Sequence, residues 1–414
     1  MHLQGFVGIA SIIGFALLLS TDRRSIRLRP VIGAVLLQFL VAILVFNVPP
    51  VTVAVEWLAR RVTDLLELSG NGASFLFGPL ASEDGPAGFV FAFKVLPILI
   101  FFSSLVAILY YLRVMQLIVA GLAFVLRRTL GVTGLESLAV AANVFLGQTE
   151  APLCVKPFLP TMTKSQLMVV MTSGFATVAG SVLLGYVEML GAGNDELKQL
   201  YAKHLITASL MSAPGAFAIA KIVMPETEDA PDERSALSAI ETPGVNIFDA
   251  AARGARDGLF LALNVGAMLI AFIALIALLD WPLAALGTST AELLGYAFWP
   301  AAWAIGIEAS DAGKIGGVMG LQIMATEFVA YLELASLIKP DEQTGMIAIS
   351  ERSGQIAAYA LCGFCNFASI GIQLGGLGTL APSRREDFAR IVFRAMLGGM
   401  LACWMTASVA SIFI

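Results

Sequence analysis

Charge is scarce in this chain. Only 13% of its 414 residues are Asp, Glu, Lys or Arg, whereas a soluble domain carries about 25%. Hydrophobic residues make up 58%, and they form long continuous runs rather than the alternating pattern of a β-barrel. The composition therefore excludes an ordinary soluble domain and predicts an all-α polytopic protein of the cell membrane, with the lipid bilayer as its surroundings.

Histidine, cysteine and basic runs are also scarce. His2 and His204 are too few for a His-based metal site. The absence of basic runs interleaved with aromatics excludes nucleic acid as a partner. The four cysteines all lie in apolar surroundings: Cys154, Cys362, Cys365 and Cys403. We interpret them as small packing residues, including the CxxC pair, because buried cysteine usually behaves as a small hydrophobe.

Eight apolar runs approach or exceed the length of about 20 residues that a spanning helix needs. We expect transmembrane helices at residues 3–20, 31–48, 94–125, 166–190, 202–224, 256–280, 354–379 and 388–413. Arginines follow the first run, which is the reverse of a cleavable signal, so we expect a retained span. The arginine clusters fall on one side if there are eight crossings, and that side is predicted to be cytoplasmic.

Three further segments are not expected to cross the membrane. Residues 51–68 are amphipathic and are predicted to form a helix at the interface. Residues 69–88 are rich in Gly, Ser and Pro and are expected to form a loop. Residues 225–244 are acidic, contain Pro and are expected to be a linker.

Two carboxylates stand in the middle of apolar runs. Glu150 lies in residues 132–162 and Glu327 in residues 309–339, and each follows a threonine. A charge in hydrocarbon costs about 2.5–3.5 kcal/mol on insertion scales and is functional by default. Both runs are flanked by charges, which predicts two opposed re-entrant helical hairpins with polar tips covered by protein. The alternative is a structural hydrogen bond to loose backbone at each tip.

A short internal match follows each hairpin. Residues 174–179 align with residues 363–368, and the alignment places Thr177 opposite Asn366. Opposed repeats with discontinuous helices and a midplane site are typical of secondary transporters. We therefore expect an inverted repeat.

Four domains are predicted from this organisation. Residues 1–128 would be scaffold spans 1–3 with the interfacial helix, and residues 129–224 the first transport repeat, with hairpin 1 and spans 4–5. Residues 225–308 would hold the linker, scaffold span 6 and an interfacial segment. Residues 309–414 would be the second transport repeat, with hairpin 2 and spans 7–8.

The two tips, if they meet, would form one polar site. Its polar members would be Gln148, Thr149, Glu150, Glu327, Asn366 and Ser369, and its apolar walls Val182 and Phe364. Carboxylates accept hydrogen bonds from hydroxyls and amines, amides both donate and accept, and an aromatic ring can stack on a flat ligand. This chemistry favours a neutral, hydroxyl-rich ligand with an aromatic part. Neither tip contains Arg or Lys, which disfavours an anion such as a dicarboxylate.

These motifs resemble those of the concentrative nucleoside transporters. The resemblance rests on Gly147–Pro152 (GQTEAP) with Asn143 before it, on Glu327–Tyr331 (EFVAY) and on Phe364–Gly371 (FCNFASIG), and it runs from about the third span to the C-terminus. It implies a cation–nucleoside symporter, for example for uridine. It also implies a homotrimer in which a mobile transport domain moves like an elevator.

The resemblance also implies a role for each site residue. Gln148, Thr149 and Glu150 would face the nucleobase. Glu327, Asn366 and Ser369 would bind the ribose hydroxyls, while Val182 and Phe364 would enclose the ring. The coupling ion, sodium, would be held by the Asn143 side chain, the Leu146 carbonyl, the Thr177 hydroxyl and carbonyl, and the Val178 carbonyl. No other cofactor is expected.

Several alternatives stay open at this point. The symporter could be coupled to protons, or it could carry another polar neutral solute. An intramembrane enzyme could use Glu150 and Glu327 as an acid/base pair, but no nucleophile or metal site is evident beside them, so the prediction is a protein that is not an enzyme. A channel would need no ion-coupled solute site.

Overall fold

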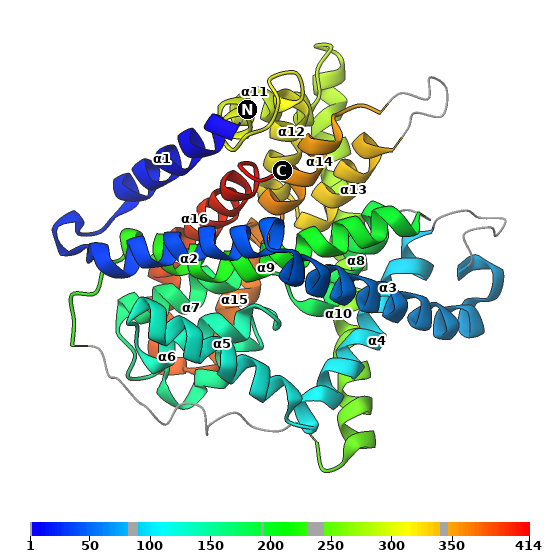
Figure 1. The fold of residues 1–414 in the computed structure, drawn as a ribbon. Helices are drawn as coiled ribbons and strands as arrows, with labels where there is room; N and C mark the ends of the chain where they lie inside the picture. Colours follow the sequence, from blue (N-terminus) through cyan, green and yellow to red (C-terminus); the bar gives the residue numbers. More distant parts are fainter. Residues whose placement is uncertain (1, 82–89, 192–193, 230–243, 340–346) are drawn as a thin grey trace.

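The computed structural model describes residues 2–81, 90–191, 194–229, 244–339 and 347–414, and helices dominate these ranges (Figure 1). The α-helices are α1 His2–Leu19, α2 Leu28–Asn47, α3 Pro49–Phe77, α4 Phe91–Tyr111, α5 Val114–Leu130, α6 Gly134–Asn143, α7 Lys164–Ala176, α8 Gly180–Gly191, α9 Asp195–Val223, α10 Ile247–Ala284, α11 Thr290–Ala304, α12 Ala312–Met324, α13 Glu327–Ile338, α14 Glu351–Ala360, α15 Phe367–Leu380 and α16 Arg385–Ala410. A 3-10 helix, η3, spans Ala151–Phe158. Shorter 3-10 turns are Arg23–Ser25, Gly78–Ala81 and Pro382–Arg384.

Six helical stretches of the described chain are long and apolar enough to cross a membrane. They are α2, α4, the joined stretch of α7 and α8, α9, α10, and the stretch that ends with α16. The apolar helices α1 and α15 are shorter. Each of the eight predicted runs thus contains an apolar helix, and the fold is all-helical as expected.

The predicted third span, 94–125, is wrong as a single helix. α4 ends at Tyr111 and α5 begins at Val114. Between them Arg113 has φ 62, the left-handed region that side chains other than glycine rarely enter. The run of 32 residues would make a helix of about 48 Å, well beyond a hydrocarbon core of about 30 Å, so the chain turns instead.

The predicted loop at 69–88 is also wrong over its described part. The amphipathic helix expected at 51–68 is present, but α3 continues to Phe77. Leu66, Ser69 and Ala73 extend its buried stripe at helical spacing, so packing outweighs the low helix propensity of Gly70 and Gly72. Residues 82–89, like 230–243 of the predicted linker, lie outside the described residues.

The runs predicted as single spans at 166–190 and 354–379 are each interrupted. α7 ends at Ala176 and α8 begins at Gly180, which leaves three residues between them. α14 ends at Ala360 and α15 begins at Phe367, which leaves six. The resemblance implied the first break. The second break could not be seen in the hydropathy of residues 354–379, because non-helical backbone that is buried in protein does not need a polar residue at every position.

Two groups of helices differ in burial. The spanning stretch of α7 and α8 is 94% buried and that of α9 is 89% buried, whereas those of α4 and α10 are only 22% and 17% buried. α4 and α10 lie side by side at one edge of the molecule (Figure 1). A Cβ on Gly258 would lie 2.7 Å from Ile100 Cα, so the absence of a side chain permits this close approach.

Candidate functional site

The second predicted tip places Glu327 in a buried hydrogen-bonded pair. Thr326 caps α13, where its side chain accepts from the Val329 N–H at 3.4 Å, and Glu327 is the first helical residue. The Glu327 side chain is reached by Asn366, whose Nδ2 donates to Oε2 at 2.6 Å. Both residues are buried. A carboxylate accepts hydrogen bonds and an amide both donates and accepts, so this pair has the chemistry to bind hydroxyl groups.

Asn366 owes its position to the start of α15. It is the N-cap residue, and its Oδ1 accepts from the Ser369 N–H at 2.8 Å. One helix end therefore brings together Glu327, Asn366 and Ser369, the three predicted ribose-binding residues. Phe364 is half-buried in the break just before them.

The first predicted tip is a tight turn that exposes Glu150. The Glu150 N–H donates to the Gly147 carbonyl at 3.0 Å, and the Gly147 N–H donates to Glu150 Oε2 at 3.3 Å. Glu150 lines a cavity of about 410 Å³. Other lining residues are Tyr110 of α4, Ser181 of α8 and Asp257 of α10. The predicted wall residue Val182 follows Ser181 and is buried.

Gln148 and Thr149 pack the first tip against α7 and α15. A Cβ on Gly174 would lie 3.0 Å from Gln148 Cβ and 2.9 Å from Gln373 Nε2. A Cβ on Gly376 would lie 3.0 Å from Thr149 Cγ2. The helix that Asn366 caps, α15, thus also contacts the first tip, seven to ten residues after Asn366.

No hydrogen bond joins Glu150 to Glu327 within the described ranges. They are connected instead through α15, whose seven to ten residues between Asn366 and the first tip correspond to about 10–15 Å of helix. Sequence reasoning missed Gln373, which is 1% exposed and donates from Nε2 to the Met171 carbonyl at 3.0 Å. Its signal was an amide in an otherwise apolar helix.

Asn143 leaves one buried oxygen free. Its Nδ2 donates to the Ala139 carbonyl at 3.1 Å and to Ser173 Oγ at 2.8 Å. Asn143 is fully buried, and its Oδ1 has no hydrogen-bond partner among the residues that the structure describes. Buried polar atoms are normally satisfied, so this oxygen needs a partner that the described residues do not supply.

The other predicted cation ligands lie around the break between α7 and α8. Thr177 is the C-cap residue of α7, and its hydroxyl donates to the Ser173 carbonyl at 2.7 Å. The Gly180 N–H donates to the Phe145 carbonyl at 3.0 Å, which ties the break to the first tip beside Leu146. Leu146 and Val178 are buried. An amide oxygen, a hydroxyl and backbone carbonyls form an oxygen-only set, which fits a hard cation such as sodium.

The second break is satisfied differently. Gln322 of α12 is 1% exposed, and its Nε2 donates to the Leu361 carbonyl at 3.0 Å and to the Gly363 carbonyl at 2.7 Å. An amide NH₂ here supplies donors to the loose carbonyls. Sequence reasoning missed Gln322, because its position relative to the break appears only in three dimensions.

Family profiles match nearly the whole chain. Residues 7–80 match the profile "Na+ dependent nucleoside transporter N-terminus", residues 92–193 match "Nucleoside recognition", and residues 204–411 match "Na+ dependent nucleoside transporter C-terminus". The chain belongs to the Na+-dependent nucleoside transporter family. Members of this family are multi-pass cell membrane transporters rather than enzymes.

This chain has relatives in bacteria and in animals. An uncharacterized transporter of Haemophilus influenzae is 41% identical over 100% of this chain and 98% of its own length. The nucleoside permease NupC of Helicobacter pylori is 37% identical over 99% and 97%. Mouse solute carrier family 28 member 3 is 38% identical over 99% of this chain, which spans 59% of that longer protein.

Solved structures of one relative, CNTnw, share the fold in two states. The inward-facing, substrate-bound structure has a TM-score of 0.91 at 41% identity and covers 99% of this chain and 98% of the other. An outward-facing structure has a TM-score of 0.92 at 40% identity and covers 100% and 97%. The nucleoside transporter predicted from the sequence motifs is confirmed at the level of the family.

Proposed function

We propose that this protein is a secondary active symporter that couples inward sodium flow to the uptake of nucleosides. The observation that carries the proposal is the Asn143 Oδ1 atom, which is buried and without a hydrogen-bond partner among the described residues. An unpaired oxygen would accept a cation, whereas a proton carrier would need a titratable group there. Leu146, Thr177 and Val178 would supply the remaining oxygens.

The nucleoside would lie between the two tips. Glu327, Asn366 and Ser369 would bind the ribose hydroxyls, because a carboxylate accepts hydrogen bonds and an amide both donates and accepts. Gln148, Thr149 and Glu150 would face the nucleobase, with Val182 and Phe364 as apolar walls. The unpaired, buried Gln148 Oε1 supports this role, since within the described ranges no donor reaches it.

The proposed architecture has eight transmembrane helices and two opposed re-entrant hairpins in an inverted repeat. The transport domain would comprise residues 129–224 and 309–414. The scaffold would comprise residues 1–128 and 225–308. Elevator-type movement would carry the tips past α4 and α10, and the cavity of about 410 Å³ that Glu150 shares with Asp257 supports a boundary between two bodies here.

A homotrimer is proposed as the working assembly, held through the scaffold. The low burial of α4 and α10 within the single chain supports a surface that lipid or neighbouring copies cover. The driving force is ample, because each sodium ion that moves inward releases about 2.3 kcal/mol per 100 mV of membrane potential, besides its concentration gradient.

Uptake of radiolabelled uridine into proteoliposomes tests the proposal. A sodium gradient should drive accumulation above equilibrium, and replacement of sodium by choline should abolish it. Accumulation that ignores sodium but follows an imposed pH gradient would favour the alternative of a proton-coupled nucleoside symporter. Failure of uridine and adenosine alike, with transport of some other polar neutral solute, would overturn the choice of substrate.

A further inference from the structure

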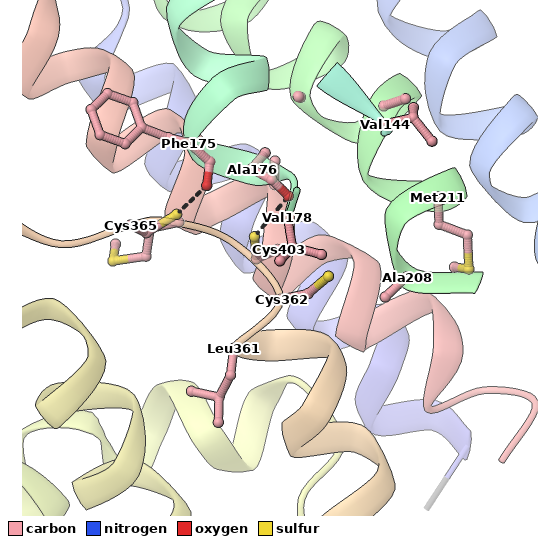
Figure 2. Packing of buried hydrophobic residues seen from close by; sticks show 14 of the residues in the cluster. Val144, Phe175, Ala176, Val178, Ala208, Met211, Leu361, Cys362, Cys365 and Cys403 are labelled. Atoms are coloured by element: carbon pink, nitrogen blue, oxygen red, sulfur yellow. Dashed lines mark hydrogen bonds between the residues drawn. The ribbon is translucent and has the colours of Figure 1, made fainter. Parts of the chain in front are cut away.

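The C-terminal end of α7 is capped by side chains from the second half of the chain. The last carbonyls of a helix lack intrahelical partners. The Phe175 carbonyl accepts from Cys365 Sγ at 3.1 Å, and the Ala176 carbonyl accepts from Cys403 Sγ at 3.3 Å. Figure 2 shows both thiols directed at these two consecutive carbonyls. Residues some 190 and 227 positions away in sequence therefore complete this helix end.

The contact between the two breaks is close as well as hydrogen-bonded. A Cβ on Gly363 would overlap the Phe175 carbonyl oxygen and would lie 2.6 Å from Cys403 Sγ. Cys365 is 1% exposed and Cys403 is fully buried, so water does not compete for either carbonyl. The ends of the two interrupted helices thus cannot shift relative to one another without loss of these contacts.

Cys365 stands between the two groups of proposed ligands. It lies between Phe364 and Asn366 in the second break. Its hydrogen-bond acceptor, Phe175, lies two residues before Thr177 and three before Val178. A single hydrogen bond therefore connects the backbone that would hold sodium to the backbone that positions the nucleoside-binding Asn366.

From this juxtaposition we infer that Cys365 is a positioning residue that couples sodium binding to nucleoside binding. The inference rests on the proposed function. When a cation binds the Thr177 and Val178 carbonyls, it orders the end of α7, and the Cys365 thiol transmits that order to Asn366 and its partner Glu327. Coupling of this kind is reciprocal, so a bound nucleoside must tighten sodium binding by the same factor.

Equilibrium binding to the purified full-length protein tests the inference. The coupling ratio is the uridine Kd without sodium divided by the Kd at saturating sodium, with choline as the replacement ion. Cys365→Ala removes the donor, and we expect it to lower this ratio about fivefold while the Kd without sodium changes less than twofold. Cys365→Ser retains a donor of similar size and should restore most of the ratio.

Cys362→Ala is the matched control. Cys362 is a buried thiol in the same break, but its sulfur does not face the Phe175 carbonyl (Figure 2). The control should retain the wild-type ratio, and thermal unfolding of each variant in detergent would show that the fold is intact. A full coupling ratio in Cys365→Ala, or equal losses in the Ala and Ser variants, would overturn the inference.

Wild-type behaviour separates this inference from the function on which it rests. If sodium has no effect on uridine binding to the unaltered protein, the proposed sodium coupling fails, and the role of Cys365 fails with it. If the wild type is coupled and Cys365→Ala is coupled equally, the symporter stands and only the role of Cys365 fails. If Cys365→Ala does not fold, Cys365→Ser tests the inference alone, and it must keep most of the wild-type coupling ratio.

Discussion

The two interrupted helices differ in how the polar groups at their breaks are hydrogen-bonded. At the first break, between α7 and α8, the nearby amide of Asn143 leaves its oxygen unpaired within the described structure. At the second, between α14 and α15, the amide of Gln322 supplies two N–H donors to the carbonyls of Leu361 and Gly363. An amide NH₂ satisfies carbonyls in the way a cation would, so Gln322 supplies donors at the second break, whereas we propose that sodium takes this part at the first.

The aligned residues Thr177 and Asn366 show the same divergence. Thr177 ends the first half-helix, and its hydroxyl donates back to Ser173. Asn366 instead begins the second half-helix, and its side chain reaches forward to Ser369 and across to Glu327. A short sequence match thus serves in one copy as a candidate cation site and in the other as a candidate substrate site.

The largest expected effect contrasts the two Thr-Glu tips. Glu327→Gln should lower sodium-driven uridine uptake about 100-fold, because a buried charged acceptor for hydroxyls contributes about 1.5–3 kcal/mol. Glu150→Gln should lower it only about tenfold, since Glu150 faces a cavity that water can enter. Initial rates in proteoliposomes measure both. Glu333→Gln, at a half-buried position of α13 that is not one of the proposed site residues, is the control and should transport normally. Equal losses at the two tips would remove the contrast.

The second expected effect is on stability. Gln322→Ala would leave two buried carbonyls without donors, and it should lower the free energy of unfolding by about 2 kcal/mol, since one unsatisfied buried group costs about 1–3 kcal/mol. Thermal unfolding in detergent measures the change. The sodium concentration for half-maximal uptake should stay within twofold of wild type. A large change in sodium dependence would contradict the view that the second break holds no ion.

Asn143→Ala, unlike Gln322→Ala, should change the sodium dependence of uptake. Loss of the free oxygen should raise the sodium concentration for half-maximal uptake about tenfold, close to the worth of one ligand–oxygen contact. Uptake rates over a sodium series at fixed uridine measure it. Ser137→Ala is the control on the same helix, because the Ser137 hydroxyl donates to the Thr133 and Gly134 carbonyls and the Asn143 amide stays. An unchanged sodium dependence would mean that the unpaired oxygen is satisfied by water rather than by the ion.

The smallest effect is expected at Thr177. Thr177→Ser keeps the hydroxyl and should change the sodium requirement less than twofold. Thr177→Val removes the hydroxyl at nearly the same volume and should raise the sodium requirement several-fold, because a donor to Ser173 and a proposed ion ligand are both lost. The ratio of the sodium requirements of these two variants measures the contribution of the hydroxyl itself. Similar behaviour of both would exclude a role for it.

Much of this fold can be read from hydropathy. Apolar runs mark the regions that contain the membrane helices. Intramembrane carboxylates mark both predicted tips, because a charge in hydrocarbon is costly and is therefore functional by default. Helix ends were less accessible. The extension of α3 to Phe77 and the six-residue second break depend on packing partners that are distant in sequence, whereas the turn at Arg113 follows from the length of the run.

By itself the amino-acid sequence determined that this protein resides in a bilayer, and it predicted a substrate site at two Thr-Glu motifs for a ligand rich in hydroxyls. The tertiary structure alone decided that the Gln322 NH₂ would donate to the carbonyls of the second break, and that the Asn143 oxygen would have no partner among the described residues. It also decided that thiols at 365 and 403 would cap a helix from the other half of the chain. The physical reason is that buried backbone groups must find partners wherever the fold brings them, and no local pattern records which distant side chain will arrive.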